Sequence, residues 1–183
     1  MGDWRLTAQN AAVIAIDMQE KLMAVMPERA GTLAAADKLL RAARILQLPA
    51  LVTLQYVKGL GPLCAELSEA TSGLPTFEKL TFSCWKHEAF QTAVKELRRQ
   101  RLLLCGVEAH VCVQQTAIDL MDAGYLVYVC ADAVCSRREL DRDVALERIR
   151  DCGAVITTVE GAVFELLREA GTPQFKACLP LFR

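Results

Sequence analysis

The stretch RLLLCGVEAHVCVQQTAIDLMDAGYLVYVCADAV, residues 101–134, contains a strand, a helix and a second strand in that order. Residues 101–107 and 125–134 are apolar runs of the kind that form strands buried on both faces. Residues 109–124 between them are typical of a helix and close at Gly124. Such a unit predicts two parallel strands joined by a right-handed crossover.

The same alternation of strands and helices extends over the rest of the chain. The remaining elements expected from their patterns are strands at 11–17, 49–56, within 74–85 and at 154–159, and helices at 31–47, 86–100, 137–153 and 161–171. Glycines and a proline predict a loop at 58–63. This order predicts an α/β fold in which helices cover both faces of a parallel sheet.

The composition suits one globular unit. The 183 residues are 53% apolar, and we expect residues 1–183 to form a single domain. Twenty-one basic residues nearly balance 22 acidic ones, which argues against nucleic acid as a partner. No apolar run has the length of a membrane span, so we expect no membrane partner.

The spacing of the eight cysteines reveals neither a metal site nor a disulfide framework. No CxxC pair is present, which disfavours a zinc knuckle or a thioredoxin-like motif. The first ten residues, MGDWRLTAQN, lack an apolar signal core, and transit peptides avoid acids such as Asp3. We therefore expect reduced, mostly buried thiols and a cytoplasmic location, with a mitochondrion or another organelle as the alternative.

Polar residues follow several of the predicted strands. Asp17 ends the first strand, Gln55 and Tyr56 end the second, Lys79 lies in the third, and Cys112 opens the helix after residue 107. Ligands of parallel α/β sheets bind beyond the carboxyl ends of the strands. An acid, a base and a thiol are therefore expected at one edge of the sheet.

These residue types match nucleophilic catalysis. The amides at a helix start and a lysine ammonium both lower the pKa of a thiol, which favours the thiolate of Cys112. A nearby Asp17 is suited to take the thiol proton and return it to a leaving group. Backbone N–H groups of the turn GVEAHVC are suited to hold an oxyanion.

Structural interpretations of the same residues remain open. Cys105 lies inside a strand, where a thiol is buried and inert, and Cys112 is equally consistent with simple packing. Asp17 fits a cap, and Lys79 fits a solvated surface group. A Cys–His dyad using His110 is disfavoured, because residues two apart on a helix face different directions.

The sequence as a whole resembles the isochorismatase-like cysteine hydrolase family. The resemblance is carried by AAVIAIDMQEKL (11–22), FEKLTFSCW (77–85) and the block GVEAHVCVQQTAIDLMDAGYLVYVCADAVCSR (106–137). LQYVKGLGPL (54–63) is most similar to the subgroup of isochorismatase domain-containing proteins. The resemblance implies a Rossmann-like three-layer α/β/α sandwich with a six-stranded parallel sheet, and a homo-oligomer.

The resemblance also implies roles for individual residues. Asp17, Lys79 and Cys112 match a catalytic triad with Cys112 as the nucleophile. A cis peptide between Val107 and Glu108 is implied, with the amides of Glu108 and Cys112 forming the oxyanion hole.

Three further residues are weaker candidates for the wall of a substrate pocket. They are Gln19, Tyr56 and Trp85. For Trp85, simple packing is the alternative.

Two departures from the family's patterns narrow the function. The metal-binding histidines that nicotinamidases of this family carry after the second strand are missing from LQYVKGLGPLC, so we expect no metal and no cofactor. True isochorismatases lack the nucleophilic cysteine that Cys112 supplies here. The favoured hypothesis is a metal-independent hydrolase of a small amide or related C–N bond through an acyl-Cys112 intermediate. The alternatives are an idle binding or scaffold protein and a vinyl-ether hydrolase acting on isochorismate-type substrates.

Overall fold

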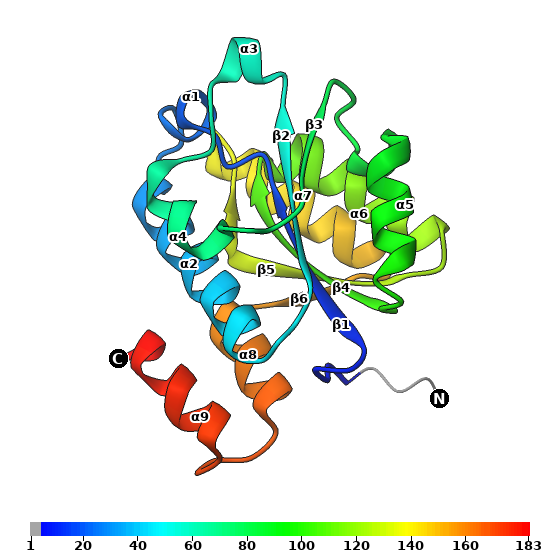
Figure 1. Ribbon diagram of the computed structural model, residues 1–183. Helices are drawn as coiled ribbons and strands as arrows, with labels where there is room; N and C mark the ends of the chain where they lie inside the picture. The colour runs from blue at the N-terminus through cyan, green and yellow to red at the C-terminus, as the bar shows by residue number, and fades with distance from the viewer. Residues whose placement is uncertain (1–4) are drawn as a thin grey trace.

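The computed structural model describes residues 5–183 and contains one parallel sheet, in the order β3-β2-β1-β4-β5-β6 (Figure 1). Its strands are β1 (Ala11–Ile16), β2 (Ala50–Gln55), β3 (Thr76–Lys79), β4 (Arg101–Val107), β5 (Leu126–Cys135) and β6 (Val155–Thr157). Every neighbouring pair of these strands is parallel. The predicted six-stranded parallel sheet is confirmed. Asp3 lies outside the described residues, and the single domain over 1–183 stays a prediction.

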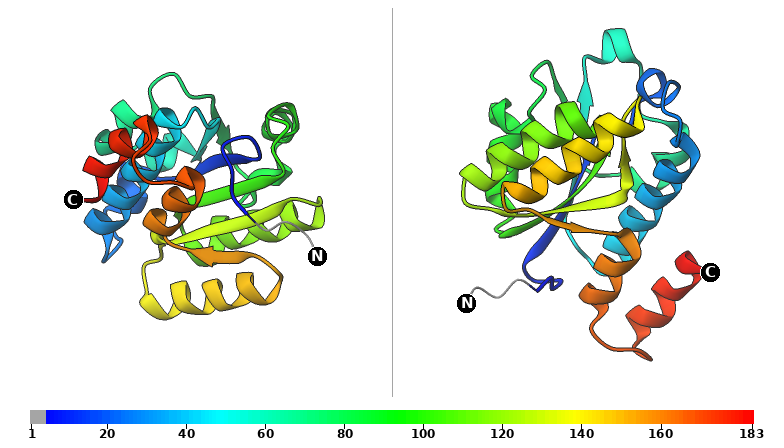
Figure 2. Two further views of the ribbon diagram at one scale, coloured as in Figure 1. Left: turned by 90° about the horizontal axis from the view of Figure 1, so that it is seen from below. Right: turned by 180° about the vertical axis from the view of Figure 1, so that it is seen from behind.

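Helices lie on both sides of the sheet, as the three-layer prediction requires. The α-helices are α1 (Glu20–Met23), α2 (Arg29–Ile45), α3 (Val57–Leu60), α4 (Ser68–Thr71), α5 (Glu88–Glu96), α6 (Gln114–Asp122), α7 (Glu139–Asp151), α8 (Val159–Leu167) and α9 (Pro173–Cys178). Short 3₁₀ turns are η1 (Ala65–Leu67), η2 (Cys84–Lys86) and η4 (Leu179–Phe182), and η3 (Ala109–Val113) is a π-helical turn. Figure 2 shows α6 and α7 on one face and α2 with α8 on the other. No helix among residues 5–183 is both long and apolar enough to cross a membrane.

The central strand β1 supplies apolar side chains to two separate cores. Its alternate residues Ala11, Val13 and Ala15 pack with α2 and α8, whereas Ala12, Ile14 and Ile16 pack with α5, α6 and α7. All six are buried. This two-sided burial is why the strand reads as a continuous apolar run, since successive side chains point to opposite faces.

Gly106 allows β4 to pack closely against β1. It pairs with Ile16, and its φ of +126° is a conformation that residues with side chains rarely adopt. A Cβ built on it would lie 2.0 Å from the main-chain oxygen of Ile16. Glycine at this position therefore brings the end of β4 beside the end of β1, where Asp17 follows.

The observed helices differ from the predicted ones mainly at their ends. The helix expected at 109–124 begins as the π-helical turn η3, and the helix expected at 86–100 shortens to α5. His87 caps α5 by accepting a hydrogen bond from the Phe90 amide, and Arg98, with a φ of +51°, turns the chain away after it. The C-terminal α9, which follows Thr172 as its cap, was not expected. The predicted loop 58–63 overlaps the short helix α3.

Candidate active site

Asp17, Lys79 and Cys112 meet at the carboxyl edge of the sheet, the upper edge of β1, β2 and β3 in Figure 1. The Nζ of Lys79 donates to Oδ2 of Asp17 over 2.6 Å, and the charges of both residues act on the pKa of the Cys112 thiol. Asp17 is fully buried, and Lys79 and Cys112 expose only 2% and 5% of their surface. The structure thus brings together the three residues that the sequence placed at one edge.

Lys79 is held by several acceptors. Its Nζ lies 2.7 Å from Oε1 of Gln55 and 3.2 Å from each of the main-chain oxygens of Thr81 and Phe82. Together with Asp17 these make four acceptors for three ammonium protons. Lys79 is therefore a fixed buried cation, and the surface role left open for it does not apply.

The pKa shifts favour a protonated thiol in the resting site. Burial raises the pKa of Cys112 well above that of an ordinary thiol, the charge of Asp17 raises it further, and Lys79 lowers it. The expectation of a lowered pKa was wrong, because the helix start and the ammonium do not offset burial beside a carboxylate. Burial lowers the pKa of Lys79, but the acidic groups Cys84, Asp17 and Cys112 raise it above its ordinary value.

The turn that carries Cys112 has an unusual main-chain pattern. The peptide between Val107 and Glu108 is cis, as the resemblance implied. The main-chain oxygen of Glu108 accepts hydrogen bonds from the amides of Val111 and Val113, the residues on either side of Cys112. Among the described residues, the Cys112 amide is not a donor to this oxygen. The hydrogen bonds of the π-helical turn to Glu108 therefore do not use the Cys112 amide, which is the donor that an oxyanion hole would need.

The side chain of Glu108 is anchored beside this turn. Its Oε2 accepts hydrogen bonds from the main-chain N–H of Arg137, over 3.1 Å, and from the Arg137 Nε, over 3.0 Å. The carboxylate is 9% exposed, while the arginine is 60% exposed. The pair connects the residue after β4 to the loop after β5.

The three weaker candidates lie in different environments. Gln19 is fully buried, and its amide bonds the main chain of Gln55 and the main-chain oxygen of Gly61. Tyr56 is 47% exposed and, with Lys79, lines a pocket of about 630 Å³. Trp85 packs edge to face on Tyr125, which directly precedes β5 at the amino edge. Gln19 therefore supports the main chain of neighbouring segments, and Tyr56 remains a candidate for the pocket wall. The contact of Trp85 with Tyr125 favours the packing role.

Two neighbours of the triad were missed from the sequence. The Thr53 hydroxyl donates to Oδ1 of Asp17 over 2.8 Å and lies 3.5 Å from the sulfur of Cys84. Cys84 is fully buried, and burial, followed by the charge of Asp17, raises its pKa to about 11. A threonine and a cysteine look like ordinary core residues in the sequence, although Cys84 directly follows the K-x-x-F-S motif.

Neither histidine is paired with the candidate nucleophile. His110 Nδ1 lies 3.0 Å from the hydroxyl of Ser136, and His87 caps α5. These contacts agree with the prediction that a Cys–His dyad is disfavoured.

One cluster offers three potential metal ligands. Glu20, Cys64 and Glu66 each bring a ligand atom within 4.8 Å of the other two. Arg29 binds both carboxylates, with 2.6 Å to Glu66 and 3.5 Å to Glu20. The Arg29 guanidinium already supplies the positive charge at this cluster. We therefore assign the cluster a structural role, which is to hold α1 against α2. The expected lack of a metal stays a prediction.

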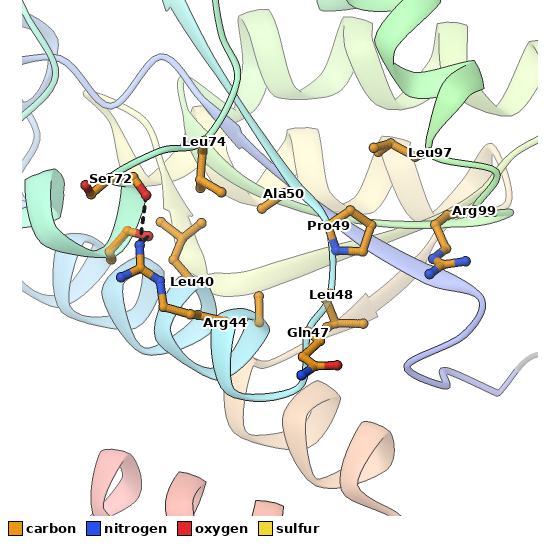
Figure 3. Close-up of a pocket in the computed structure, with 12 residues that line it drawn as sticks. Leu40, Arg44, Gln47, Leu48, Pro49, Ala50, Ser72, Leu74, Leu97 and Arg99 are labelled. Carbon is orange, nitrogen blue, oxygen red and sulfur yellow. Dashed lines mark hydrogen bonds between the residues drawn. The ribbon is translucent and has the colours of Figure 1, made fainter.

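The pocket in Figure 3 lies away from the triad. It has a volume of about 660 Å³ and is lined by the end of α2, the start of β2 and Arg99 after α5. Arg44 at its rim donates to the main-chain oxygen of Ser72 over 2.9 Å. Because it lies at the amino edge of the sheet, it is not part of the candidate active site.

Two relatives match nearly the whole chain. The secreted isochorismatase effector Isc1 of Phytophthora sojae is 37% identical over 98% of this chain and 87% of its own length. Isochorismatase domain-containing protein 2 of Danio rerio is 39% identical over 96% of this chain and 88% of its own length.

Solved structures share the fold at similar coverage. MAR1 ribonuclease from Caenorhabditis elegans has a TM-score of 0.92 at 36% identity, covering 97% of this chain and 92% of its own. YcaC from Escherichia coli, an octameric hydrolase of unknown specificity, has a TM-score of 0.92 at 28% identity over 100% and 91%. YcaC from Pseudomonas aeruginosa, solved with covalent acrylamide, has a TM-score of 0.91 at 28% identity over 99% and 93%. The family model of the isochorismatase domain matches residues 11–161, and the chain belongs to this family of hydrolases.

Proposed function

We propose that the protein hydrolyses a small amide or related C–N bond through a thioester on Cys112, without a metal. The observation that carries the proposal is the buried ion pair of Asp17 and Lys79, whose charges act on the buried thiol of Cys112. A thiol, a carboxylate within its reach and a fixed cation are the parts that acyl transfer needs. The acrylamide bound covalently in P. aeruginosa YcaC supports a nucleophile in that relative.

The reaction follows from the resting protonation state. As the Cys112 sulfur attacks the carbonyl carbon, its proton passes to Asp17, and the amides of Glu108 and Cys112 receive the oxyanion. The C–N bond then breaks while Asp17 returns the proton to the leaving nitrogen. Water attacks the thioester, Asp17 accepts a proton from that water, and the acid product leaves as the thiol re-forms. Lys79 holds the Asp17 carboxyl group in place throughout, because its Nζ lies 2.6 Å from Oδ2.

The direct test is capture of the thioester. The protein is mixed with a panel of small amides, and acyl adducts are located by peptide mass. We expect an adduct on Cys112 and none in Cys112→Ala, while Cys152→Ala, which removes an exposed thiol, changes nothing. Turnover that forms no adduct and persists in Cys112→Ala would contradict the mechanism. Turnover of isochorismate alone would support the vinyl-ether alternative, and no turnover of either class would support a scaffold.

RNA cleavage is a second candidate because of the MAR1 ribonuclease from C. elegans. The formal charge of -1 does not favour a polyanionic substrate. We propose a small-molecule substrate instead, and release of fragments from a labelled RNA, lost in Cys112→Ala, would overturn this choice.

We also propose that the protein is a homo-oligomer. E. coli YcaC is octameric, and Tyr56, Leu80 and Phe82 are 47%, 73% and 53% exposed near the catalytic edge. Light scattering should show several copies, and Leu80→Glu should reduce that number. Leu140→Glu, on the exposed face of α7, should leave the mass unchanged.

The proposed location is the cytoplasm. All eight cysteines are free and seven are buried, as expected for reduced thiols. The P. sojae relative is secreted, so the location of a tagged full-length chain is the measurement to make.

A further inference from the structure

The two charges of the candidate site come from strands that are not neighbours. Asp17 follows β1 and Lys79 ends β3, and β2 lies between them. Two strand spacings separate β1 from β3, about 10 Å in all. The Lys79 side chain must therefore cross over β2 to reach Asp17, and β2 is in a position to support both.

β2 offers one side chain to each charge. Thr53 and Gln55 are two residues apart, so they point to the same face of the strand. Thr53 donates to Oδ1 of Asp17 over 2.8 Å, and Oε1 of Gln55 accepts from Lys79 over 2.7 Å. Both side chains are buried, with exposures of 0% and 8%.

Gln55 is itself held in one orientation. Its Nε2 donates to the main-chain oxygen of Leu80 over 2.8 Å, which leaves Oε1 to face Lys79. Gln19 brackets its main chain, accepting from the N–H over 2.7 Å and donating to the oxygen over 2.9 Å. Gln55 is therefore fixed at its side-chain amide by Leu80 and at its main chain by Gln19.

We propose that Thr53 and Gln55 are positioning residues of the triad. Thr53 fixes the rotation of the Asp17 carboxylate by donating to Oδ1, which leaves Oδ2 for Lys79. Gln55 keeps Lys79 in place as a fixed cation that donates no proton to substrate. This inference rests on the proposed function, because it assigns supports to the same three residues.

The test uses iodoacetamide, so that no substrate is needed. The rate of Cys112 alkylation is measured against pH and located by peptide mass. In the native protein the rate should reach a plateau, and Asp17→Asn should lower that plateau about a hundredfold, because the thiol then has no acceptor for its proton. If Asp17→Asn leaves the profile unchanged, the proposed function fails and not merely the positioning.

Thr53→Val tests the first support. The carboxylate loses the donor that fixes its rotation, so the plateau rate should fall about tenfold. Thr53→Ser keeps the hydroxyl and should restore the native rate. If Thr53→Val does not fold, Thr53→Ala also removes the hydroxyl and should show the same loss. The matched control is Thr71→Val, because the Thr71 hydroxyl is also buried and donates to the main-chain oxygen of Leu67. A native plateau in Thr53→Val, or an equal loss in Thr71→Val, overturns the proposal.

Gln55→Met tests the second support. It removes the acceptor while keeping a side chain of similar length, so the plateau rate should fall about tenfold as Lys79 loses its position. Gln91→Met removes an amide whose hydrogen-bond partner among the described residues is the main-chain oxygen of Trp85, and this variant should react at the native rate. A native plateau in Gln55→Met, or an equal loss in Gln91→Met, contradicts the assignment.

Discussion

The Nζ of Lys79 lies 2.6 Å from Oδ2 of Asp17, with side-chain exposures of 1% and 0%. Such a buried pair is costly to break, because the remaining charge cannot return to water. The proposed catalytic chemistry and the folding stability therefore depend on the same contact, and variants at either position must be examined for both.

Lys79→Met should destabilise the protein by about 3–5 kcal/mol, because Asp17 is left buried without its counter-charge. The measurement is the free energy of unfolding in urea. The double variant Asp17→Asn with Lys79→Met leaves no buried charge and should recover part of the loss. Equal stability of the single variant and the native protein would show that the ion pair does not support the fold.

Gly106→Ala should cost about 4 kcal/mol or more, or prevent folding, because the added methyl group would meet the main-chain oxygen of Ile16 at 2.0 Å. Gly31→Ala is the matched control. Gly31 lies in α2 with no atom within 4 Å of an added Cβ, and the change should stabilise the helix by about 0.5 kcal/mol. Thermal melting of both variants checks the contrast, and a native melting temperature for Gly106→Ala would contradict the close approach of β4 to β1.

The buried thiols should make the protein sensitive to alkali. Burial raises the pKa of Cys84 to about 11 and that of Cys105 to about 12, from 9.0 for an ordinary thiol. Above pH 9 the unfolded chain loses these protons while the folded chain keeps them, so the free energy of unfolding falls as pH rises. Each fully buried thiol contributes a slope of about 1.4 kcal/mol per pH unit in this window.

Denaturation in urea between pH 8 and 11 under reducing conditions measures that slope. Cys105→Ala should lower the slope, and Cys152→Ala should retain it, since Cys152 is exposed. A slope that is identical in all three proteins would mean that the folded thiols ionise as readily as the unfolded ones.

His110→Ala should keep adduct formation within about threefold of the native rate, because its ring bonds Ser136 and Asp17 is the proposed proton acceptor. Asp17→Asn should lower the rate by about a hundredfold or more. Mass detection of acylated Cys112 distinguishes the two variants. A collapse in His110→Ala with activity in Asp17→Asn would instead support a Cys–His dyad.

Much of the fold and the triad could be predicted because buried parallel strands have a distinctive pattern. Asp17 is conspicuous as a charge at the end of the apolar strand β1, where a sheet gathers its ligand-binding groups, whereas Lys79 ends the short polar strand β3. The short helix α9 escaped prediction, since six residues are too few for a helical period to emerge. Its start was nevertheless signalled by Thr172 followed by Pro173.

What could not be predicted depends on contacts between distant segments. Thr53 reads as an ordinary strand residue until β1 lies beside it. The place of Trp85 depends on how η2 turns the chain toward Tyr125. The pKa of Cys112 was misjudged because local sequence reports the helix start but not the loss of solvent around the sulfur.

The chemistry is divided between the two halves of the chain. Asp17 and Lys79 precede the exposed Gln100, Cys112 follows it, and the halves join where β4 pairs with β1. Opening the chain at Gln100 would leave the sulfur on one fragment and its acid and ammonium on the other. Hydrolysis would then report reassembly of the two fragments, which makes this junction a natural place to build a split enzyme.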